Sequence, residues 1–269
     1  MSHVRVTGLT KVFGDRPARA LRMLDDGRSK GEILEETGNV VAVRDVGFEV
    51  ERGELFVVMG LSGSGKSTVI RMLNRLIEPT RGTVEVDGED IASLADDELR
   101  SMRAQTMSMV FQHFALFPHR TVGENAAYGL KVQGVPEDER RERAERALAR
   151  VGLEGWTDKY PHEMSGGMKQ RVGIARGLAT DADILLMDEP FSALDPLIRR
   201  DMQDLLMDLQ AELKRTIVFI THDLNEAMRI GDRIAVMRDG GVVQVGTGED
   251  IIHDPANQYV ADFVADVDR

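Results

Sequence analysis

The sequence has no cysteine, no excess of basic residues and no long apolar run, and each absence excludes a class of protein. Without cysteine the chain can form neither disulfides nor thiolate metal sites, which is typical of a reducing compartment. No apolar stretch approaches the roughly 20 residues that span a bilayer, and the N-terminal "MSHVRVTGLTKVFG" lacks the apolar core of a secretory signal. We therefore expect a soluble, cytosolic chain.

The charge of the chain argues against nucleic acid as its main partner. There are 46 acidic residues against 34 basic ones, and the net charge of -12 repels a polyanion. Local binding of phosphate is still compatible with this balance. With 269 residues, of which 42% are hydrophobic, the chain can fill the core of one large α/β domain or of two small ones.

The first third of the sequence predicts strands interrupted by helices. "HVRVTGLTKVFG" alternates as a strand does, and "VVAVRDVGFEVERGELFVVMG" reads as two further strands joined by a turn at Arg52 and Gly53. Between them, Ala18, Leu21 and Leu24 fall at helical spacing. A capping box, S-x-x-E at residues 29–32, begins a second helical run. Residues 17–38 are thus predicted to be two short helices inserted between strands.

The rest of the chain predicts helices around buried parallel strands. The run after Lys66 places Val69, Ile70, Leu73 and Leu76 on one helical face. The segment 136–152 is a charged helix with a narrow apolar stripe, and its charges are most simply a solvated face. "ADILLMDEP" and "RTIVFITHD" are apolar runs separated by a helical segment, which is typical of parallel strands buried on both faces. "DRIAVMRDGGVVQVG" reads as a hairpin with Gly240 and Gly241 in its turn.

A phosphate-binding loop is predicted where the apolar "VVM" stops at a glycine-rich segment. The pattern G-x-x-x-x-G-K-[ST] lies between a strand and a helix, so backbone N–H groups and the helix N-terminus can surround phosphates. Lys66 would pair with the β- and γ-phosphates, and the Ser67 hydroxyl would bind Mg²⁺. The alternative is a glycine-rich turn with an exposed lysine. The nucleotide-binding residues predicted here are Gly60, Leu61, Ser62, Gly63, Ser64, Gly65, Lys66, Ser67 and Thr68.

Two carboxylates are predicted to complete the site, one as a ligand of Mg²⁺ and one as the base for the attacking water. Asp188 closes the apolar strand "ILLM" at its carboxyl end, where open α/β sheets bind ligands, and it would be the second anchor of Mg²⁺. Glu189 follows immediately and could act as the general base that deprotonates the attacking water. The alternative is that "DEP" merely ends a strand at a turn.

Two polar residues follow other predicted strands. Gln112 comes after "MSMVF", and His222 comes after "IVFIT". A lone residue of this kind is more often a structural hydrogen-bonding group. Both nevertheless lie where the loops of a parallel sheet would converge on the phosphate site.

The stretch "MSGGMKQRVGIARGLA" is the motif that best discriminates between the possible functions. Ser165, Gly166 and Gly167 form a second small-residue anion site at the start of a helix. A single phosphate loop does not need two such helix starts, but a second one makes sense if it closes over a nucleotide held by another copy of the chain. "GLSGSGKST", Gln112, "MSGGMKQ", "ILLMDEP", "SALD" and "THD" together resemble, in order and approximate spacing, the ATP-binding subunits of ABC transporters.

This resemblance covers essentially the whole chain. It implies an α/β fold, the ABC ATPase fold, in which a P-loop NTPase core carries an antiparallel β subdomain and an inserted α-helical subdomain at roughly residues 112–172. It implies ATP and Mg²⁺ as ligands and a second copy of the chain as partner. Carried over by position, Phe13 in "KVFG" would stack on adenine, although a core phenylalanine is the alternative.

The resemblance also assigns the remaining polar residues. Gln112 would sense magnesium and the membrane partner, and His222 would contact the γ-phosphate. Ser165, Gly166 and Gly167 would contact the γ-phosphate across the dimer, where Asp195 would lie at the interface. The commonest signature in the family is LSGGQ, and this sequence has Met164 and Met168 instead of its first and last residues. Neither change removes the serine or the glycines.

The subfamily is indicated by further stretches. "ALRMLDDGRSKGEILEETG", "NRLIEPTRG", "FSALDPLIR" and "HDLNEAMRIGDRIAVM" closely resemble ATPase subunits of importers for glycine betaine, proline betaine and choline. Transmembrane permease subunits and, indirectly, an extracytoplasmic substrate-binding protein would then be partners, and the chain would lie at the cytoplasmic face of the membrane. Such subunits often carry tandem cystathionine-beta-synthase (CBS) domains after the cassette, and we expect none within these 269 residues.

Three other functions stay open at this point. An importer for another solute is the main alternative, since this subunit never touches the solute. A soluble ABC ATPase acting on DNA or ribosomes would usually carry long coiled coils, two cassettes or basic surfaces, whereas this chain has one cassette and a net negative charge. The third is a regulatory module that binds nucleotide without hydrolysing it, and the presence of Glu189, the predicted general base, argues against it.

Overall fold

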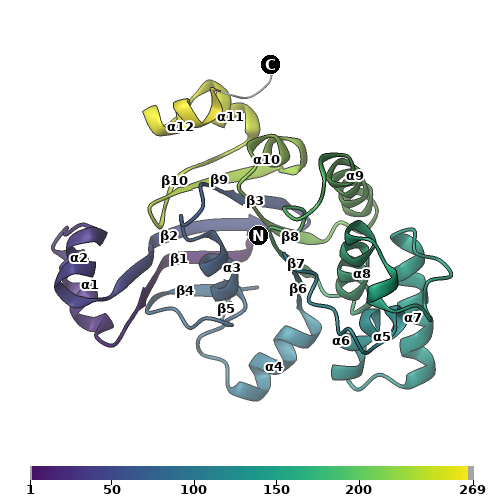
Figure 1. Cartoon of the computed structure of the whole chain (residues 1–269). Coiled ribbons are helices and arrows are strands. Elements are labelled where there is room, and N and C mark those ends of the chain that lie inside the picture. Colours follow the sequence, from purple (N-terminus) through teal and green to yellow (C-terminus); the bar gives the residue numbers. More distant parts are fainter. Residues whose placement is uncertain (1, 266–269) are drawn as a thin grey trace. The chain divides into compact units, whose positions relative to one another are not determined.

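The structure is a computed structural model that describes residues 2–265 (Figure 1). The chain divides into two compact units. The first unit comprises Met1–Arg52, Phe56–Leu94 and Thr221–Arg269. The second comprises Gly53–Leu55 and Ala95–Ile220.

An antiparallel sheet forms one part of the first unit. Its strand order is β2-β1-β4-β5. The two long strands β1 and β2 alternate between buried and exposed residues, because one face of the sheet is covered and the other is not. Phe13, at the end of β1, lies opposite Val40, at the start of β2. The strands are β1 (Ser2–Phe13), β2 (Val40–Glu51), β4 (Arg81–Val86) and β5 (Glu89–Asp90).

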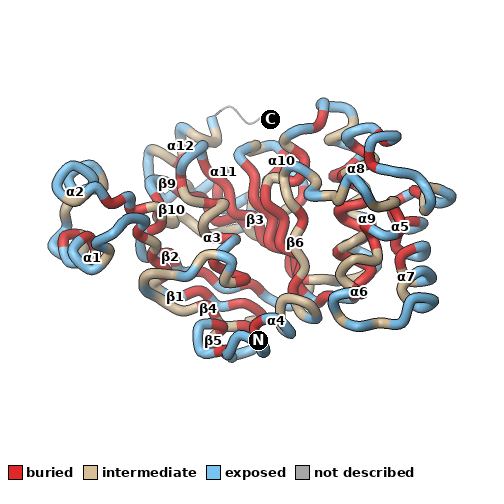
Figure 2. The backbone as a smooth tube through the Cα atoms, turned by 60° about the horizontal axis from the view of Figure 1, so that its bottom comes forward, coloured by how far each residue is buried: buried red, intermediate tan, exposed pale blue. Residues whose placement is uncertain are grey.

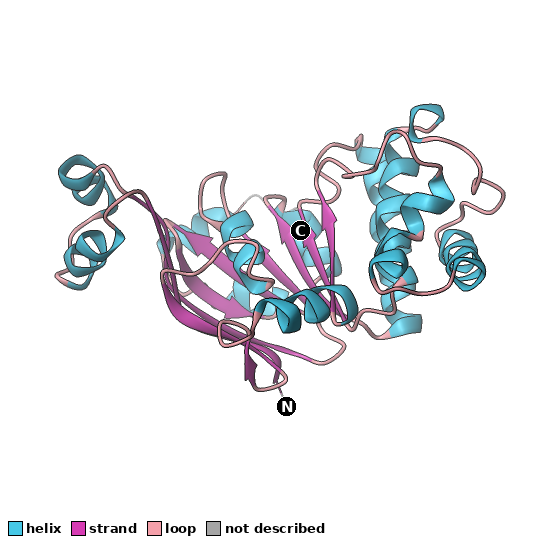
Figure 3. Cartoon of the chain, turned by 90° about the horizontal axis from the view of Figure 1, so that it is seen from below, coloured by secondary structure: helices cyan, strands magenta, loops and turns pink. Residues whose placement is uncertain are grey.

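Two short helices, α1 (Pro17–Asp25) and α2 (Lys30–Thr37), connect β1 to β2. They lie beyond the ends of these strands (Figure 3). The capping box expected at Ser29 is present, with Ser29 Oγ accepting from the Glu32 N–H at 3.3 Å and Glu32 accepting from the Ser29 N–H at 2.8 Å. Exposed residues outnumber buried ones in both helices, so the inserted segment lies at the surface of its unit.

The apolar face of α1 differs from the predicted one. Ala20 and Met23 are the buried residues, whereas Ala18 is exposed. The buried cluster comprises Val12, Ala20, Met23, Ile33 and Val41, with Leu21 and Leu24 packed against its edge. The long Met23 side chain buries far more apolar area than Ala18 could. The face of α1 that contains Met23 is therefore the one that packs against the buried cluster.

A second group of strands in the first unit carries the predicted phosphate loop. Their order is β10-β9-β3, with β9 parallel to β3 and antiparallel to β10. The turn between β9 and β10 consists of Asp239 and Gly240, and Gly241 is the first residue of β10 rather than part of the turn. The elements of this group are β3 (Leu55–Met59), α3 (Lys66–Leu73), α10 (Leu224–Ile230), β9 (Arg233–Arg238), β10 (Gly241–Gly246), α11 (Gly248–His253) and α12 (Gln258–Val264).

Helix α3 ends earlier than its apolar pattern predicts. It stops at Leu73, and the expected last apolar position, Leu76, lies outside the helix with 51% of its surface exposed. Arg75 adopts a left-handed conformation, with a φ of 54°. Asn74 Oδ1 accepts from the Leu76 N–H at 3.2 Å, so an asparagine turn replaces the next helical hydrogen bond.

The second unit holds three parallel strands and most of the helices. The strand order is β8-β7-β6, and β7 pairs in parallel with both neighbours. Its helix α7 carries two ion pairs between residues four apart, Glu139–Arg143 and Glu142–Arg146. The elements are α4 (Asp96–Gln105), β6 (Met107–Phe111), α5 (Val122–Ala126), α6 (Tyr128–Val132), α7 (Glu137–Arg150), η1 (Pro161–Glu163), α8 (Gly166–Ala179), β7 (Ile184–Asp188), α9 (Pro196–Leu213) and β8 (Thr216–Thr221).

Burial follows the predicted character of the strands. Every residue of β3, β7 and β8 is buried, as expected for parallel strands covered on both faces, and β3 is among the buried segments visible in Figure 2. No helix among residues 2–265 is both long enough and apolar enough to cross a membrane.

Candidate functional site

The phosphate loop predicted after β3 contains three glycines with positive φ, and two of them lie too close to neighbouring strands for any side chain. Gly60, Gly63 and Gly65 all have positive φ, of 153°, 79° and 101°. A Cβ atom added at Gly60 would lie 2.4 Å from the Met237 carbonyl oxygen, and one at Gly65 would lie 2.6 Å from that of Ala42. The loop therefore needs glycine both for its backbone conformation and for its close approach to neighbouring strands.

Lys66, the first residue of α3, turns its side chain back into this loop. Its exposed fraction is 4%, and its Nζ donates to the carbonyl oxygens of Gly60 at 2.8 Å and Leu61 at 3.1 Å. A buried ammonium held by carbonyl oxygens at a helix N-terminus gives a positive site that an anion can enter. The alternative of an exposed lysine on a glycine-rich turn does not fit this burial.

Phe13 lies at the surface, so it is not a core phenylalanine. Its exposed fraction is 40%, and the Lys11 Nζ lies 5.0 Å from the centre of its ring. Its register partner Val40 is 50% exposed. Two residues after Val40, the Ala42 carbonyl adjoins the phosphate loop at Gly65. The structure thus places an exposed apolar pair close to the loop within one unit.

The second unit brings Gln112 and Asp188 to one edge of its parallel strands. Phe111, the last residue of β6, pairs with Asp188, the last residue of β7, so Gln112 and Glu189 both follow directly at the carboxyl ends of these neighbouring strands. Asp188 is buried, with 3% of its surface exposed. This edge is where open α/β sheets bind ligands.

The backbone of Glu189 is in an unusual conformation. Its φ is 45°, in the left-handed region, although the residue before a proline normally prefers an extended conformation. Hydrogen bonds hold it on both sides, because its N–H donates to the Ile220 oxygen at 3.1 Å and its oxygen accepts from Ser192 Oγ at 2.9 Å. Such conformations cost on the order of 1–3 kcal/mol and cluster at functional sites.

Ser165 and Asp195 both occupy helix N-caps in the second unit. Ser165 Oγ accepts from the Met168 N–H at 3.3 Å and begins α8, while an Asp195 carboxylate oxygen accepts from the Ile198 N–H at 3.1 Å and begins α9. The starts of these two helices are packed together, since a Cβ atom added at Gly167 would lie 2.5 Å from Ile198 Cγ2. The Ser165 hydroxyl proton and the first N–H groups of α8 can donate to an anion.

His222 directly follows β8 and is exposed. The next residue, Asp223, caps α10 by accepting from the Glu226 N–H at 3.1 Å. The site residues therefore form two groups. The phosphate loop, Phe13 and His222 belong to the first unit, while Gln112, Asp188, Glu189, Asp195 and the Ser165–Gly167 segment belong to the second.

The available donors are those that magnesium prefers. Ser67, Gln112 and Asp188 offer a hydroxyl, an amide and a carboxylate oxygen, and hard cations take oxygen ligands. In residues 2–265 no group of three or more His, Cys, Asp or Glu side chains could hold a metal by itself. These three side chains supply oxygen donors of the kind that a hard cation takes, and they belong to different units of the chain.

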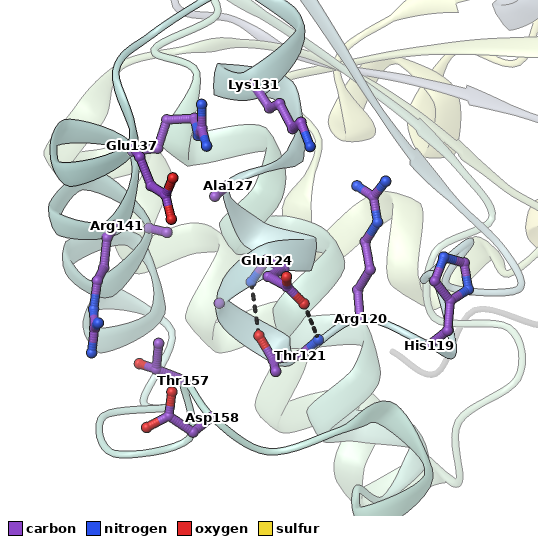
Figure 4. Close-up of a pocket in the computed structure, with 13 residues that line it drawn as sticks. His119, Arg120, Thr121, Glu124, Ala127, Lys131, Glu137, Arg141, Thr157 and Asp158 are labelled. Carbon is purple, nitrogen blue, oxygen red and sulfur yellow. Dashed lines mark hydrogen bonds between the residues drawn. The ribbon is translucent and has the colours of Figure 1, made fainter.

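A cavity of about 670 Å³ lies among the helices of the second unit (Figure 4). Asn125 organises the segment that enters it: this fully buried side chain accepts from the Phe117 N–H at 2.7 Å and donates to the oxygens of Phe117, Arg120 and Thr121. The Arg120 guanidinium lies 4.6 Å from the Phe117 ring centre and 4.9 Å from that of Tyr128. Basic side chains outnumber acidic ones in the lining, which includes Arg120, Lys131, Arg140, Arg141, Glu124, Glu137 and Asp158.

The family model described as "ABC transporter" matches residues 43–192. The fold resembles a dimeric bacterial ABC transporter cassette, with a TM-score of 0.76 and 33% identity over 91% of this chain and 98% of that chain. A dimeric post-hydrolysis state of that cassette, bound to ADP and Pi, gives a TM-score of 0.75 over the same shares of both chains. The chain belongs to the ABC transporter family and is an ATP-binding cassette, which confirms the predicted family and fold.

Curated relatives indicate the branch of the family. The chain is 57% identical to the glycine betaine/carnitine transport ATP-binding protein GbuA of Listeria monocytogenes over 100% of this chain and 68% of the relative. It is 58% identical to the glycine betaine/proline betaine transport system ATP-binding protein ProV of Escherichia coli over 98% of this chain and 66% of the relative. The chain thus spans about two thirds of the length of these relatives.

Two features of the site escaped the sequence interpretation. Val40 stands beside Phe13 only because β1 and β2 pair across the inserted helices, and no local pattern reveals that register. The left-handed backbone of Glu189 is likewise invisible in the sequence, since a residue before proline predicts extended structure.

Proposed function

We propose that this chain is the ATP-hydrolysing subunit of an ABC importer for glycine betaine or another quaternary-amine osmolyte. The observation that carries the proposal is the phosphate loop, in which Lys66 is buried against the carbonyl oxygens of Gly60 and Leu61. Phosphate oxygens entering the loop would replace these carbonyls as partners of the ammonium. The relatives named for glycine betaine transport supply the solute class.

In the proposed reaction two copies of the chain hold ATP between them. The Gly60–Thr68 loop of one copy binds the phosphates while Phe13 stacks on the adenine. Ser165, Gly166 and Gly167 of the other copy donate to the γ-phosphate, and Asp195 lies at the interface between the copies. The dimeric solved relative supports this assembly.

The residues at the strand ends would carry out the chemistry. Glu189 takes a proton from the attacking water, and His222 contacts the γ-phosphate. Ser67, Asp188 and Gln112 would hold Mg²⁺, which would neutralise charge on the β- and γ-phosphate oxygens. Glu189 is kept in place by the hydrogen bonds on both sides of its peptide units. Hydrolysis would then release the two copies from each other.

The cavity in Figure 4 is the proposed docking place of a permease subunit at the cytoplasmic face of the membrane. Residues 113–122 run from the Gln112 loop to this cavity, so a short cytoplasmic helix seated there would sense the loop. The excess of basic side chains in the lining favours an acidic segment. An extracytoplasmic binding protein would act only indirectly, through the permease.

An importer for another solute is the second candidate. The trimethylamine N-oxide transport system ATP-binding protein TmoW of Ruegeria pomeroyi is 51% identical over 96% of this chain and 76% of the relative. The test is solute-stimulated ATP hydrolysis by the complex reconstituted with its permease and binding protein. Stimulation by glycine betaine supports the first candidate, and stimulation by trimethylamine N-oxide alone supports the second. A complex that hydrolyses no ATP under any condition would overturn both.

A further inference from the structure

The loop that follows Gln112 contains an unusual turn. Phe114 and Ala115 are consecutive residues with left-handed φ, of 61° and 48°, and neither is glycine. The Ala115 N–H donates to the His113 oxygen at 2.6 Å, which closes a three-residue turn centred on Phe114. Turns of this kind with positive φ are rare and strained, so neighbouring structure must hold them.

One side chain of α8 holds this turn. The Arg176 guanidinium donates to the Ala115 oxygen at 2.7 Å and to the Phe114 oxygen at 3.5 Å. Burial lowers the pKa of this guanidinium, and no carboxylate in the described part of the chain offsets that effect. The two peptide carbonyls must compensate the hydration that the guanidinium loses on burial. Hydrogen bonds from a charged donor are stronger than those between neutral groups.

The same loop lies along α8 toward the Ser165 end. A Cβ atom added at Gly166 would lie 3.8 Å from Phe114 Cζ, and one at Gly173 would lie 3.8 Å from the Phe114 oxygen. Gln170 is four residues after the first of these glycines and three before the second, so it lies on the same face of the helix. The loop after Gln112 and the helix that Ser165 begins therefore share one interface.

This interface is not fully satisfied. Gln170 is fully buried, and neither its Nε2 nor its Oε1 has a hydrogen-bond partner among the described residues. A buried amide without partners is unfavourable, so a small shift of the loop that brought a peptide group to Gln170 would be stabilised. A strained turn beside an amide without hydrogen-bond partners is expected where a loop can adopt two conformations against a helix.

We propose that Arg176 is a positioning residue that couples the Gln112 loop to the helix begun by Ser165. By holding the turn at Phe114 and Ala115 it makes the loop move with the helix, so that Gln112 reaches its working position only when the Ser165 segment is in place. The part of this inference that concerns catalysis rests on the proposed function. The part that concerns the loop does not.

Arg171 provides a matched control on the same helix. Its Nη1 donates to the Val151 oxygen at 2.6 Å, so it also holds a carbonyl, but in a loop that does not lead to Gln112. The variants to compare are Arg176→Met, Arg176→Gln and Arg171→Met, each in the full chain. Gln keeps a polar side chain at position 176 but is too short to bond both carbonyls.

The first measurement is hydrogen exchange followed by mass spectrometry, which needs no ATP hydrolysis. Arg176→Met should speed exchange of the amides at residues 113–117 by about tenfold, as expected for the loss of a charged hydrogen bond, while Arg171→Met leaves these amides unchanged. Unchanged exchange in Arg176→Met, or equal acceleration in both variants, would overturn the proposal. If Arg176→Met does not fold, the same criteria apply to Arg176→Gln.

The second measurement separates kcat from KM for ATP. Arg176→Met should lower kcat by about tenfold to a hundredfold while KM changes by less than about twofold, because a misplaced Gln112 impairs the reaction but not the phosphate loop. Arg171→Met should change neither. A normal kcat together with accelerated exchange at 113–117 would overturn the coupling. A wild-type chain without ATPase activity would defeat the proposed function instead, and the exchange result would still decide the role of Arg176 in the loop.

Discussion

Phe13 and Val40 face each other across β1 and β2, and both side chains remain exposed, by 40% and 50%. Exposed apolar pairs are ordinary on protein surfaces, but this one lies two residues from Ala42, whose carbonyl adjoins the phosphate loop. The pair therefore forms an exposed apolar surface near the loop proposed to bind phosphates, and we propose that a nucleobase stacks there.

Replacing Phe13 by Ala should weaken ATP binding by on the order of 1–3 kcal/mol, because stacking is lost. The binding of GTP should be weakened by a comparable amount, since every base has a π-face. Titration of a fluorescent nucleotide measures both affinities. Leu34→Ala on α2 is the control, because Leu34 is a similarly exposed apolar residue at 48%. Equal nucleotide affinities in wild type and Phe13→Ala would remove Phe13 from the site.

Glu189→Gln should lower hydrolysis by about 10²–10⁴-fold, the usual contribution of a general base, and leave ATP binding and dimerisation intact. The amide matches the carboxylate in size, so the left-handed backbone at this position should persist. Phosphate release in a purified sample measures the effect, with Glu139→Gln on the exposed face of α7 as control. Near-normal turnover in Glu189→Gln would show that another group is the base.

Lys66 of one copy of the chain and Ser165 of the other copy should contact the same ATP, and the two residues of a single copy should not. Lys66→Ala loses phosphate pairing, and Ser165→Arg blocks closure, so each homodimer has two broken sites. A mixture of the two variants can form one complete site beside one doubly broken site. Size-exclusion chromatography with ATP, in a Glu189→Gln background that slows turnover, should therefore show partial dimerisation only in the mixture.

The single Ser165→Arg variant decides this prediction, since rescue could also fail if closure needs both sites. It should neither dimerise with ATP nor hydrolyse it at the wild-type rate, although its own phosphate loop still binds nucleotide. Normal dimerisation and ATPase activity in Ser165→Arg would mean that this segment does not contact nucleotide across a dimer.

Residues 17–38 should contribute to stability but not to ATP binding. Gly14 and Asn39 are adjacent, since a Cβ atom at Gly14 would lie 2.0 Å from Asn39 Oδ1, so a short glycine linker can replace the two helices. The shortened chain should melt at a lower temperature, because Val12 and Val41 lose the cover of Ala20, Met23 and Ile33. Its affinity for ATP should stay within about twofold of wild type. A large loss of affinity would show that the helices support the nucleotide site.

The capping box of α2 should make stability depend on pH. The Ser29 N–H and hydroxyl, which donate to Glu32, lower the pKa of that carboxyl. A group with a lowered pKa in the folded state stabilises the fold above its ordinary pKa, about 4.3, and this contribution is lost as the pH falls below it. Wild type should therefore melt at a higher temperature than Glu32→Gln at pH 7, and the difference should shrink as the pH falls from the ordinary pKa of Glu32 through its lowered pKa in the folded state. A difference independent of pH would contradict this explanation, and Glu35→Gln on the same helix is the control.

Local patterns were sufficient for much of this protein. Alternating residues predicted β1 and β2, continuous apolar runs predicted β7 and β8, and the S-x-x-E pattern predicted the cap of α2, because each of these depends on neighbours in the chain. The spacing of glycines and Lys66 predicted the phosphate loop for the same reason. Ordered motifs then identified the family, and the comparisons confirmed it.

Other features depended on contacts between distant segments, and only the tertiary structure decided them. The packing of Met23 in one cluster with Val12 and Val41 set which face of α1 is buried. The register of β1 with β2 put Val40 beside Phe13. The left-handed turn at Phe114 and Ala115 has its carbonyls hydrogen-bonded by Arg176, about 60 residues further on, and no local preference of phenylalanine or alanine predicts that conformation.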